Sequence, residues 1–394
     1  MYAHPSFLGL RSQDHFAHML ASGFEARGHI VSVRRPAPIV RRWIPAGRLA
    51  KWAGYIDQYL LFPPRLRATM RGDPVDTLYV FCDQALGPWV PLATRRPHVI
   101  HCHDLLALRS ALGDVPENPT SWSGRLYQRY IRRGFRRGRH FISISQKTRA
   151  DLHRFGGIAP STSEVVYNGM NHAYRRLPPG QSGDLLCRAG VPVGATGGLL
   201  HVGGGQWYKN TAGVVLLYAH YARAAARDGA TPVELWLVGP PASGSVLSAL
   251  AEVPATGRVR FFSGLDNEAL QALYSSAIAL LFPSLAEGFG WPIVEALACG
   301  CPVFTTDEAP MNEVGGDAAT YLPRLRHADD SNAWAAAAAQ VLIAMLNRPA
   351  SERERLAASG VQWAQRFSAD AAIDHYLSHY ERVLQFERAR LTGV

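Results

Sequence analysis

The stretch LLFPSLAEGFGWPIVEALACGCPV, residues 280–303, decides which fold and function are expected of the chain. Its apolar start, Leu280–Phe282, predicts a buried strand, and a glycine-rich turn that carries Glu287 comes next. A helix is expected from Pro292, because the missing N–H of proline costs nothing at a helix start. That helix carries a second carboxylate, Glu295, about one turn in.

A strand, a glycine loop and a helix in this order form a favourable site for an anion. The loop and the helix start present backbone N–H groups and the positive end of the helix dipole. Two carboxylates would repel a phosphate, so they need a different ligand. Carboxylates accept two or more hydrogen bonds, which suits sugar hydroxyls. A loop that binds both phosphate and hydroxyls indicates a nucleotide sugar.

Length and composition set the broad class. The 394 residues suffice for two domains, and 47% apolar residues are typical of a globular protein. No apolar run approaches the roughly 20 residues that span a bilayer, and the start at residues 1–5 does not resemble a signal peptide. We therefore expect a cytoplasmic protein. The five cysteines lie in or beside apolar stretches, and we interpret them as buried side chains and not as zinc ligands.

The basic charge lies in the N-terminal half. Residues 1–180 hold 26 Lys and Arg against 11 Asp and Glu, a net charge of +15, and residues 181–394 hold the remaining 15 against 20, a net charge of −5. The arginines cluster at 34–71 and 125–139. This pattern fits an anionic substrate or an anionic membrane surface, or simply a solvated surface. Nucleic acid is not expected, because no recognised binding motif accompanies the charge.

Strands and helices alternate along the chain. A strand at residues 2–5, a helix at 12–26 and a strand at 29–33 form a βαβ opening, which predicts a parallel sheet. Further strands are expected at 77–81, 97–102, 140–144, 163–167, 198–202, 233–238, 258–262, 278–282 and 302–305. After residue 305 the chain is expected to be helical, with helices at 332–346, 351–366 and 369–390.

Residues 49–61 predict a helix, before Pro63 and Pro64 break the pattern. The helical spacing of three and four residues places four side chains on one face of this helix: Trp52, Ile56, Tyr59 and Leu60. This helix either covers the sheet with that apolar face or forms a lip that touches an acceptor or a membrane.

Two further groups of residues are candidates for a site. His103 and Asp104 follow the expected strand at 97–102, and ligands bind at the carboxyl ends of parallel strands. Neither a zinc site nor a Ser/His/Asp triad can be assembled around them from spacing. A second glycine loop, Gly203–Gly205, leads to Lys209, which can supply a charge to a phosphate. It matches neither a Walker loop nor a dinucleotide-binding fingerprint.

The array Glu287-x7-Glu295, with Gly288, Phe289 and Gly290 between its two acids, resembles the retaining nucleotide-sugar glycosyltransferases of family 4. The resemblance covers most of the chain and is most specific at residues 280–303. It implies the α/β GT-B fold: two Rossmann-like, doubly wound domains that face each other across a cleft. We expect an acceptor-binding domain at 1–180, a donor-binding domain at 181–368, and a helix at about 369–390 that crosses back to the first domain.

The resemblance also implies roles. Glu295 would bind the donor ribose, and Glu287 the donor sugar and pyrophosphate together with backbone N–H groups near Phe289. Lys209 would neutralise the leaving pyrophosphate, and His103 would reach the transferred sugar from the opposite domain. The implied catalytic residues are His103, Lys209 and Glu287. The implied donor-binding residues are Gly203, Gly204, Gly205, Lys209, Gly239, Gly264, Leu265, Glu287, Gly288, Phe289, Gly290 and Glu295. The implied acceptor-binding residues are Gly9, His103 and Asp104.

The chain departs from the family pattern at two places. Gly204 stands where many relatives have an arginine, so the phosphate charge rests on Lys209, backbone N–H groups and an arginine still to be found. The first glycine loop carries Gly9 and lacks the usual double glycine. The resemblance implies no metal and no cofactor, and no residue is an obvious nucleophile.

The expected function is transfer of a hexose, with retention, from GDP-mannose or a UDP-hexose to a saccharide or lipid-linked saccharide. Polysaccharide biosynthesis and peripheral attachment to the inner face of a membrane fit this function. Three alternatives stay open at this point. They are a nucleotide-sugar epimerase of the same fold, a phosphorylase with a pyridoxal-binding lysine, and a non-catalytic module that binds nucleotide sugars or a membrane.

Overall fold

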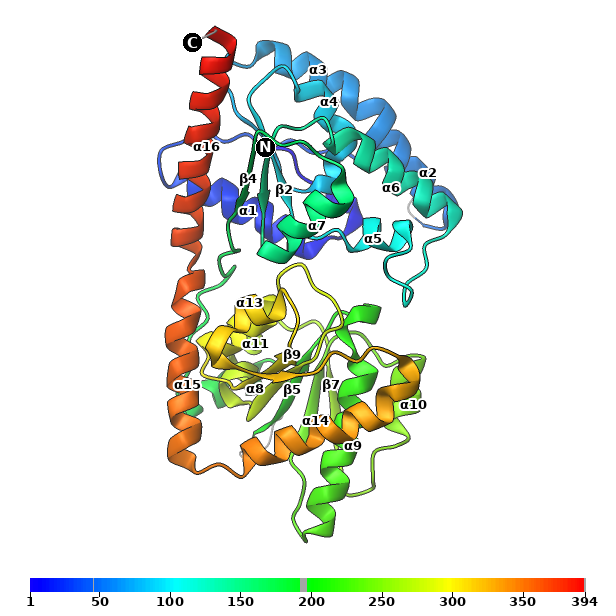
Figure 1. Cartoon of the computed structure of the whole chain (residues 1–394), viewed down its shortest axis with the longest axis vertical. Helices are drawn as coiled ribbons and strands as arrows, with labels where there is room; N and C mark the ends of the chain where they lie inside the picture. The colour runs from blue at the N-terminus through cyan, green and yellow to red at the C-terminus, as the bar shows by residue number, and fades with distance from the viewer. Residues whose placement is uncertain (45, 192–196, 393–394) are drawn as a thin grey trace. The chain divides into compact units, whose positions relative to one another are not determined.

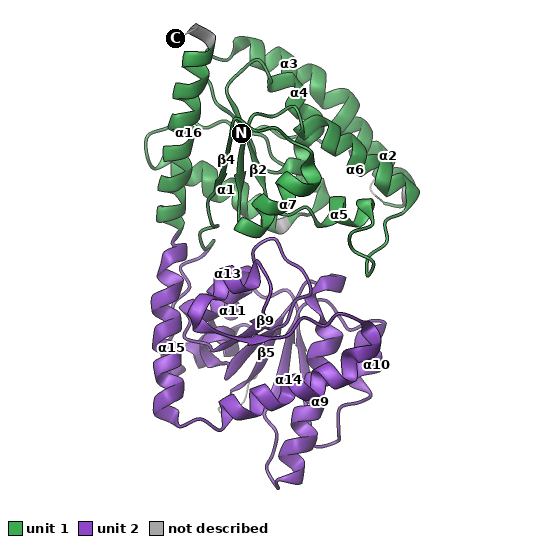
Figure 2. Cartoon of the chain, viewed as in Figure 1, with its two compact units in different colours: residues 1–171, 369–394 green, residues 172–368 purple. Residues whose placement is uncertain are grey.

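The computed structural model describes residues 1–44, 46–191 and 197–392. The chain forms two compact units, Met1–Asn171 with Ala369–Val394, and His172–Ser368 (Figure 2). Each unit is a parallel sheet flanked by helices (Figure 1). The predicted α/β fold of two parallel-sheet domains is confirmed. No helix in these ranges is long and apolar enough to cross a membrane.

Unit 1 contains a four-stranded parallel sheet in the order β1-β2-β3-β4. Three of the strands are fully buried, which explains their near-continuous apolar sequences. The strands are β1 (Tyr79–Phe81), β2 (His98–Cys102), β3 (His140–Ser143) and β4 (Thr162–Val165). The helices are α1 (Arg11–Glu25), α2 (Arg48–Ile56), α3 (Phe62–Gly72), α4 (Val90–Ala93), α5 (Leu106–Leu112), α6 (Trp122–Phe135), α7 (Gln146–Gly156) and α16 (Ala369–Thr392).

Unit 2 contains a six-stranded parallel sheet in the order β10-β9-β8-β5-β6-β7. The strands are β5 (Gly198–Val202), β6 (Glu234–Val238), β7 (Val259–Phe262), β8 (Ala279–Phe282), β9 (Val303–Thr306) and β10 (Ala319–Leu322). The helices are α8 (Pro179–Arg188), α9 (Thr211–Arg227), α10 (Ser245–Leu250), α11 (Asn267–Ser276), α12 (Trp291–Ala298), α13 (Met311–Gly315), α14 (Ser331–Leu346) and α15 (Ala350–Ala364). Helices α9 and α14 pack on this sheet, and their buried residues form one apolar core with β5, β6 and β8.

The last helix, α16, returns to unit 1 and packs beside α1. Tyr376 and Tyr380 of α16 are buried against Phe16 and Phe24 of α1. The Tyr380 hydroxyl also lies 2.6 Å from Nε2 of the buried His101 in β2. The crossing helix expected at about 369–390 is therefore present, and aromatic packing holds it on the first domain.

A buried carboxylate fastens the far end of α16. Glu387 has no exposed surface and accepts hydrogen bonds from Arg139 (2.8 and 3.0 Å), from His140 Nε2 (2.9 Å) and from Arg390 (2.9 Å). Burial alone would raise the pKa of Glu387, but these three donors outweigh it and lower the pKa to about 2. Glu387 is thus an ionised group that joins α16 to the start of β3.

Acidification is expected to destabilise unit 1. Burial lowers the pKa of His98 to about 4 and also lowers the pKa of His140, so both rings are neutral in the folded state. Groups with a lowered pKa contribute stability above their unfolded pKa, and this is lost as the pH falls through the folded value. The contribution of His98 to stability is therefore lost between pH 6.5 and about pH 4, and the contribution of Glu387 is lost between pH 4.5 and about pH 2. We expect the urea concentration at the unfolding midpoint to be lower at about pH 5 than at about pH 7.5. An unchanged midpoint would contradict this.

The boundary between the units lies at Asn171–His172, whereas the predicted boundary is at 180. Tyr174 is 6% exposed, its ring lies against that of Tyr274 in α11, and the amide of Leu177 donates to Ser275. These contacts place residues 172–180, which were expected in the first domain, in the second unit.

Four predictions about elements are wrong. Residues 2–5 and 29–33 are not strands: only isolated bridges form, Tyr2 with Arg34 and with Phe81, and Ile30 is fully exposed. The helix at 49–61 does not end at Pro63. It passes through a π-helical turn, Asp57–Leu61, into α3, where the prolines occupy the first turn that tolerates them. The C-terminal part is also not wholly helical, because β10 lies there.

Candidate functional site

The strand order of unit 2 reverses between β5 and β8. From β5 the chain proceeds to β6 and β7 on one side, and β8 is followed by β9 and β10 on the other. Ligands of open α/β sheets bind at the carboxyl ends of the two strands that flank such a switch point. Residues 203–210 follow β5 and residues 283–290 follow β8. These are the two glycine-rich loops that the sequence analysis singled out.

Lys209 and Glu287 meet between these loops. Lys209 ends a short 3-10 helix, Trp207–Lys209, and its Nζ lies 2.7 Å from Oε1 of Glu287. Their side chains are only 13% and 8% exposed. Nζ also lies 4.7 Å from the ring centroid of Phe282, and the amide of Leu285 donates to the Tyr208 carbonyl over 2.7 Å. The structure thus brings two predicted catalytic residues into one partly buried ion pair.

Close backbone contacts explain the glycines of the first loop. A Cβ at Gly239, after β6, would lie 2.1 Å from the carbonyl oxygen of Gly203, and Gly205 adopts φ +78°. Asn210, the residue before α9, also has a positive φ of 54°, and its side-chain amide donates to the Pro283 carbonyl. These features hold the loops after β5, β6 and β8 close together. Gly204 has an ordinary φ, and only the Gln206 side chain lies near its Cβ position.

A buried histidine in β5, His201, links the start of the first glycine loop to its surroundings through hydrogen bonds. His201 of β5 is 1% exposed; Nδ1 donates to the Leu281 carbonyl (2.8 Å), and Nε2 lies 3.0 Å from the Thr211 hydroxyl. Burial, with a smaller contribution from the nearby Lys209, lowers the pKa of His201 to about 4, so the ring is neutral at pH 7. The neutral ring adds no charge beside Lys209.

Glu295 is the fifth of the eight residues of α12 and is 6% exposed. Its Oε2 accepts a hydrogen bond from the hydroxyl of Tyr274 over 2.9 Å. Burial raises the pKa of Glu295 to about 7, against the opposing effects of Tyr274 and Lys209. This carboxyl group therefore changes its protonation near neutral pH.

In the loop before α12, residues 288–290 leave only backbone groups available to a ligand. Gly290 has φ +98° at the residue preceding the helix, a conformation that requires glycine. Next to it, Phe289 is 5% exposed and its ring packs edge-on against Phe367. The Phe289 ring thus belongs to the core, and residues 288–290 can offer a ligand only their backbone. Gly264 and Leu265, in contrast, form an exposed to half-exposed turn after β7.

Arg324 is a candidate that sequence reasoning missed. It follows β10, is 14% exposed, and its Nε donates to the Leu285 carbonyl over 2.8 Å. Glu308 lies 3.7 Å from the same nitrogen. The guanidinium therefore contacts the loop that carries Glu287. The signal that could have found Arg324 is its place after a strand, but that strand itself was not predicted.

His103, in unit 1, follows β2 and is 8% exposed. Its Nε2 lies 2.9 Å from the Cys82 carbonyl and its amide donates to the Gln84 side chain. Burial lowers the pKa of His103, although the nearby Asp83 opposes the change. The imidazole is thus neutral at pH 7, with the Nε2 proton donated to Cys82.

Asp83 and His4 form a second missed group beside His103. Nε2 of His4 lies 3.0 Å from Oδ2 of Asp83, and both side chains are buried. Burial would raise the pKa of Asp83, but the hydrogen bonds that it accepts from His4 and from the amide of Ala85 help to lower the pKa below its usual value. Asp83 follows the buried strand β1, with Cys82 between them. The rule that selected His103 would therefore have selected it too.

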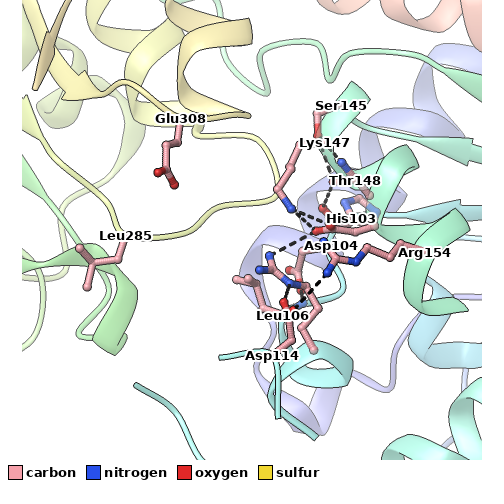
Figure 3. A network of polar contacts seen from close by, with 12 residues as sticks. His103, Asp104, Leu106, Asp114, Ser145, Lys147, Thr148, Arg154, Leu285 and Glu308 are labelled. Atoms are coloured by element: carbon pink, nitrogen blue, oxygen red, sulfur yellow. Dashed lines mark hydrogen bonds and ion pairs between the residues drawn. The ribbon is translucent and has the colours of Figure 1, made fainter. Parts of the chain in front are cut away.

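Asp104 belongs to a polar network at the same edge of the sheet (Figure 3). Its Oδ1 accepts from the amide of Leu106 at the start of α5. Ser145 accepts from the amide of Thr148, whose hydroxyl donates to the His103 carbonyl. A chain of ion pairs between α7 and α5 adjoins these residues: Lys147 with Asp151, Asp151 with Arg109, Arg109 with Asp114 and Asp114 with Arg154.

The remaining predicted acceptor residue, Gly9, is exposed and has φ +65° in the turn before α1. It thus lies in unit 1, like His103 and Asp104, whereas the predicted donor residues all lie in unit 2. Among the described residues, no three His, Cys, Asp or Glu side chains lie close enough to hold a metal ion. Independence of metal stays a prediction.

Two family models match the chain, one on each unit. Glycosyltransferase Family 4 matches residues 13–174, and Glycosyl transferases group 1 matches residues 197–343. O-antigen chain mannosyltransferase B of Escherichia coli is 32% identical over 125 residues, which is 32% of this chain. The match spans 30% of the length of that curated relative.

Solved structures share the fold. Sucrose-phosphate synthase from Thermosynechococcus elongatus superposes with a TM-score of 0.68 at 18% identity, over 95% of this chain and 94% of that one. Alr3699/HepE of Anabaena, solved in complex with UDP and glucose, gives a TM-score of 0.61 at 19% identity, over 91% and 88% of the two chains. The two family models and this fold agree with the motif at residues 280–303: the chain belongs to the family 4 (group 1) glycosyltransferases of the GT-B fold.

Proposed function

We propose that the protein transfers a hexose from a nucleotide-diphosphate sugar, GDP-mannose or a UDP-hexose, to a saccharide or lipid-linked saccharide. The observation that carries this proposal is the Lys209–Glu287 pair at the switch point of the unit 2 sheet. The E. coli relative is by name an O-antigen chain mannosyltransferase, and the Anabaena structure holds UDP and glucose. The first name supports a role in polysaccharide biosynthesis, and the second agrees with a nucleotide-sugar donor.

The proposed chemistry begins with cleavage of the bond between the anomeric carbon and the pyrophosphate oxygen. Negative charge develops on that oxygen, and the Lys209 ammonium stabilises it in a partly buried site where charges interact strongly. Glu287, released from Lys209, accepts hydrogen bonds from the sugar hydroxyls. Arg324 supplies the second cation that the sequence analysis did not place. Catalysis then consists mostly of positioning and charge stabilisation.

The acceptor hydroxyl forms the new bond to the anomeric carbon. We propose that it attacks on the face from which the pyrophosphate departs, which gives retention, and that its proton passes to the leaving phosphate. His103, Asp104 and Gly9 of unit 1 are the proposed acceptor-side residues. The neutral His103 offers a hydrogen bond to a sugar without placing a charge beside the reacting carbon.

Acceptor-free turnover tests this function. Nucleotide sugars are incubated with the protein in a panel of bases and hexoses, and release of nucleoside diphosphate is followed. Slow release from one donor, unchanged by EDTA, is expected, and the anomeric configuration of the product is then read by NMR. Tight donor binding without release in any acceptor screen would instead favour a non-catalytic nucleotide-sugar-binding module.

The proposed ribose role of Glu295 predicts a pH dependence of donor binding. Because its pKa is about 7, Glu295 becomes protonated as the pH falls from about 8 to about 6 and loses accepting capacity for ribose hydroxyls. The Kd for a nucleotide sugar is expected to rise by up to about tenfold over this interval. Titration calorimetry on the wild type and on Glu295→Gln, which cannot titrate, measures it. An equally steep profile in the variant would refute the assignment.

A further inference from the structure

Two helices of unit 1 expose an unusual number of large apolar side chains. Leu49, Trp52 and Leu60 are 67%, 65% and 67% exposed, and Trp122 of α6 is 75% exposed. Helical spacing predicts one face formed by Trp52, Ile56, Tyr59 and Leu60. Tyr59 is half-buried, and the other three side chains are exposed. The α2–α6 face, as we call it, consists of Trp43, Leu49, Trp52, Ile56, Leu60, Trp122, Leu126 and Tyr130.

Tyrosine contacts make these residues one surface. The rings of Tyr55 and Tyr127 stack with centroids 5.4 Å apart, and the hydroxyls of Tyr59 and Tyr127 lie 2.6 Å apart. Tyr59 also meets the ring of Tyr130 edge-on. Figure 1 shows α2 and α6 side by side at the edge of unit 1. Both helices therefore expose their apolar side chains together.

The two segments that carry this surface are strongly basic in sequence, although Arg139 at the end of the second pairs with Glu387. Residues 39–72 hold seven Lys and Arg, residues 121–139 hold another seven, and the two segments contain one acid, Asp57. Asp57 is 1% exposed and accepts from the amides of Val40 and Arg41, so it adds no charge to the surface. Arg125 and Arg129 are exposed on the same side of α6 as Trp122 and Leu126. Apolar and cationic side chains are thus interleaved.

A recess opens on the same side of α6. A cavity of about 300 Å³ lies between α5 and α6, lined by Leu108, Leu112, Trp122 and Leu126 together with Arg125 and Arg129. Arg132 lines the cavity as well, and apolar walls with three arginines suit part of an amphiphile that has an anionic head group.

We propose that the α2–α6 face docks unit 1 on an anionic lipid bilayer. Tryptophan and leucine side chains enter the interfacial region of a membrane, and arginines beside them attract anionic head groups. Exposed tryptophans and leucines interleaved with arginines over two helices are the pattern of helices that lie in a membrane interface, so the proposal commits to a bilayer. The proposal does not depend on the transferase activity.

Vesicle sedimentation of the full chain tests the proposal. Binding to phosphatidylcholine vesicles that contain phosphatidylglycerol is expected at low salt, with weak binding to pure phosphatidylcholine. Trp52→Ser/Trp122→Ser and Arg125→Glu/Arg129→Glu should each weaken the partition by about tenfold or more. Bilayer contact should also shift the tryptophan emission of the wild type to shorter wavelength.

Matched variants on unit 2 control for charge and hydrophobicity. Arg227 and Arg355 are exposed on α9 and α15, and Leu247 is 55% exposed on α10. Arg227→Glu/Arg355→Glu and Leu247→Ser are expected to retain wild-type binding, and thermal melts check that every variant folds. Equal losses in these controls, equal binding to both kinds of vesicle, or no binding at all would overturn the proposal. So would a dimer in solution that Trp52→Ser/Trp122→Ser abolishes, because the face would then contact a second copy.

Discussion

Replacement of Lys209 by alanine is expected to lower the release of nucleoside diphosphate from the donor by about 100- to 1,000-fold, the usual cost of losing one group that stabilises transition-state charge. The variant removes the cation that faces the leaving pyrophosphate and leaves Glu287, which is only 8% exposed, without its partner. Both effects act on the proposed transition state. Steady-state release of nucleoside diphosphate at saturating donor measures the change in kcat.

A second ion pair of unit 2 supplies the control. Arg176 pairs with Glu354, both side chains are at least half exposed, and neither residue belongs to the loops after β5 and β8. Arg176→Ala is therefore expected to leave the release rate within about twofold of wild type, since exposed pairs contribute little. Wild-type turnover in Lys209→Ala, with the fold intact, would remove Lys209 from the mechanism.

Replacement of Glu387 by alanine is expected to lower the free energy of unfolding by about 3–5 kcal/mol, because it leaves the buried His140 and the partly buried Arg139 without the carboxylate that accepts their hydrogen bonds. Arg139, His140 and Arg390 all donate to this carboxylate, and His140 has no exposed surface. Urea unfolding followed by circular dichroism gives the value. The loss should shrink at low pH, where the wild type itself loses the contribution of Glu387.

The same helix carries the matched control. Asp374 pairs with Arg27 over 2.6 Å, but its side chain is 63% exposed. Asp374→Ala is expected to cost less than about 1 kcal/mol, as exposed pairs do. If both variants lose the same amount, burial does not distinguish the two carboxylates and the account of how α16 is held is wrong.

The candidate donor site of unit 2 was largely predictable from the sequence, because local rules govern it. Apolar runs marked β5 and β8, and the glycines and carboxylates that follow them lie within a few residues of each strand. The reversal of strand order then brings the two loops together, so that Lys209 meets Glu287 although 78 positions separate them. The sequence could name both residues but not their ion pair.

The failures have physical causes too. β10 has only four residues and follows a glycine turn, so it gave no periodic signal, and Arg324 was missed with it. The face of Trp52 and Leu60 was predicted from its helical spacing, but spacing does not tell whether an apolar face meets a core or an external partner. Asp83 follows β1 as His103 follows β2, but the apolar Cys82 stands between the strand and Asp83, so the polar strand end is less evident in the sequence.

The most direct test of the central claim is calorimetric titration of UDP and GDP into the wild type and into Lys209→Ala. We expect one of the two nucleotides to bind to one site per chain. Lys209→Ala should weaken this binding markedly, and Arg176→Ala should not. If neither nucleotide binds, or if the affinity is the same with and without Lys209, the loops after β5 and β8 are not a nucleotide-sugar site.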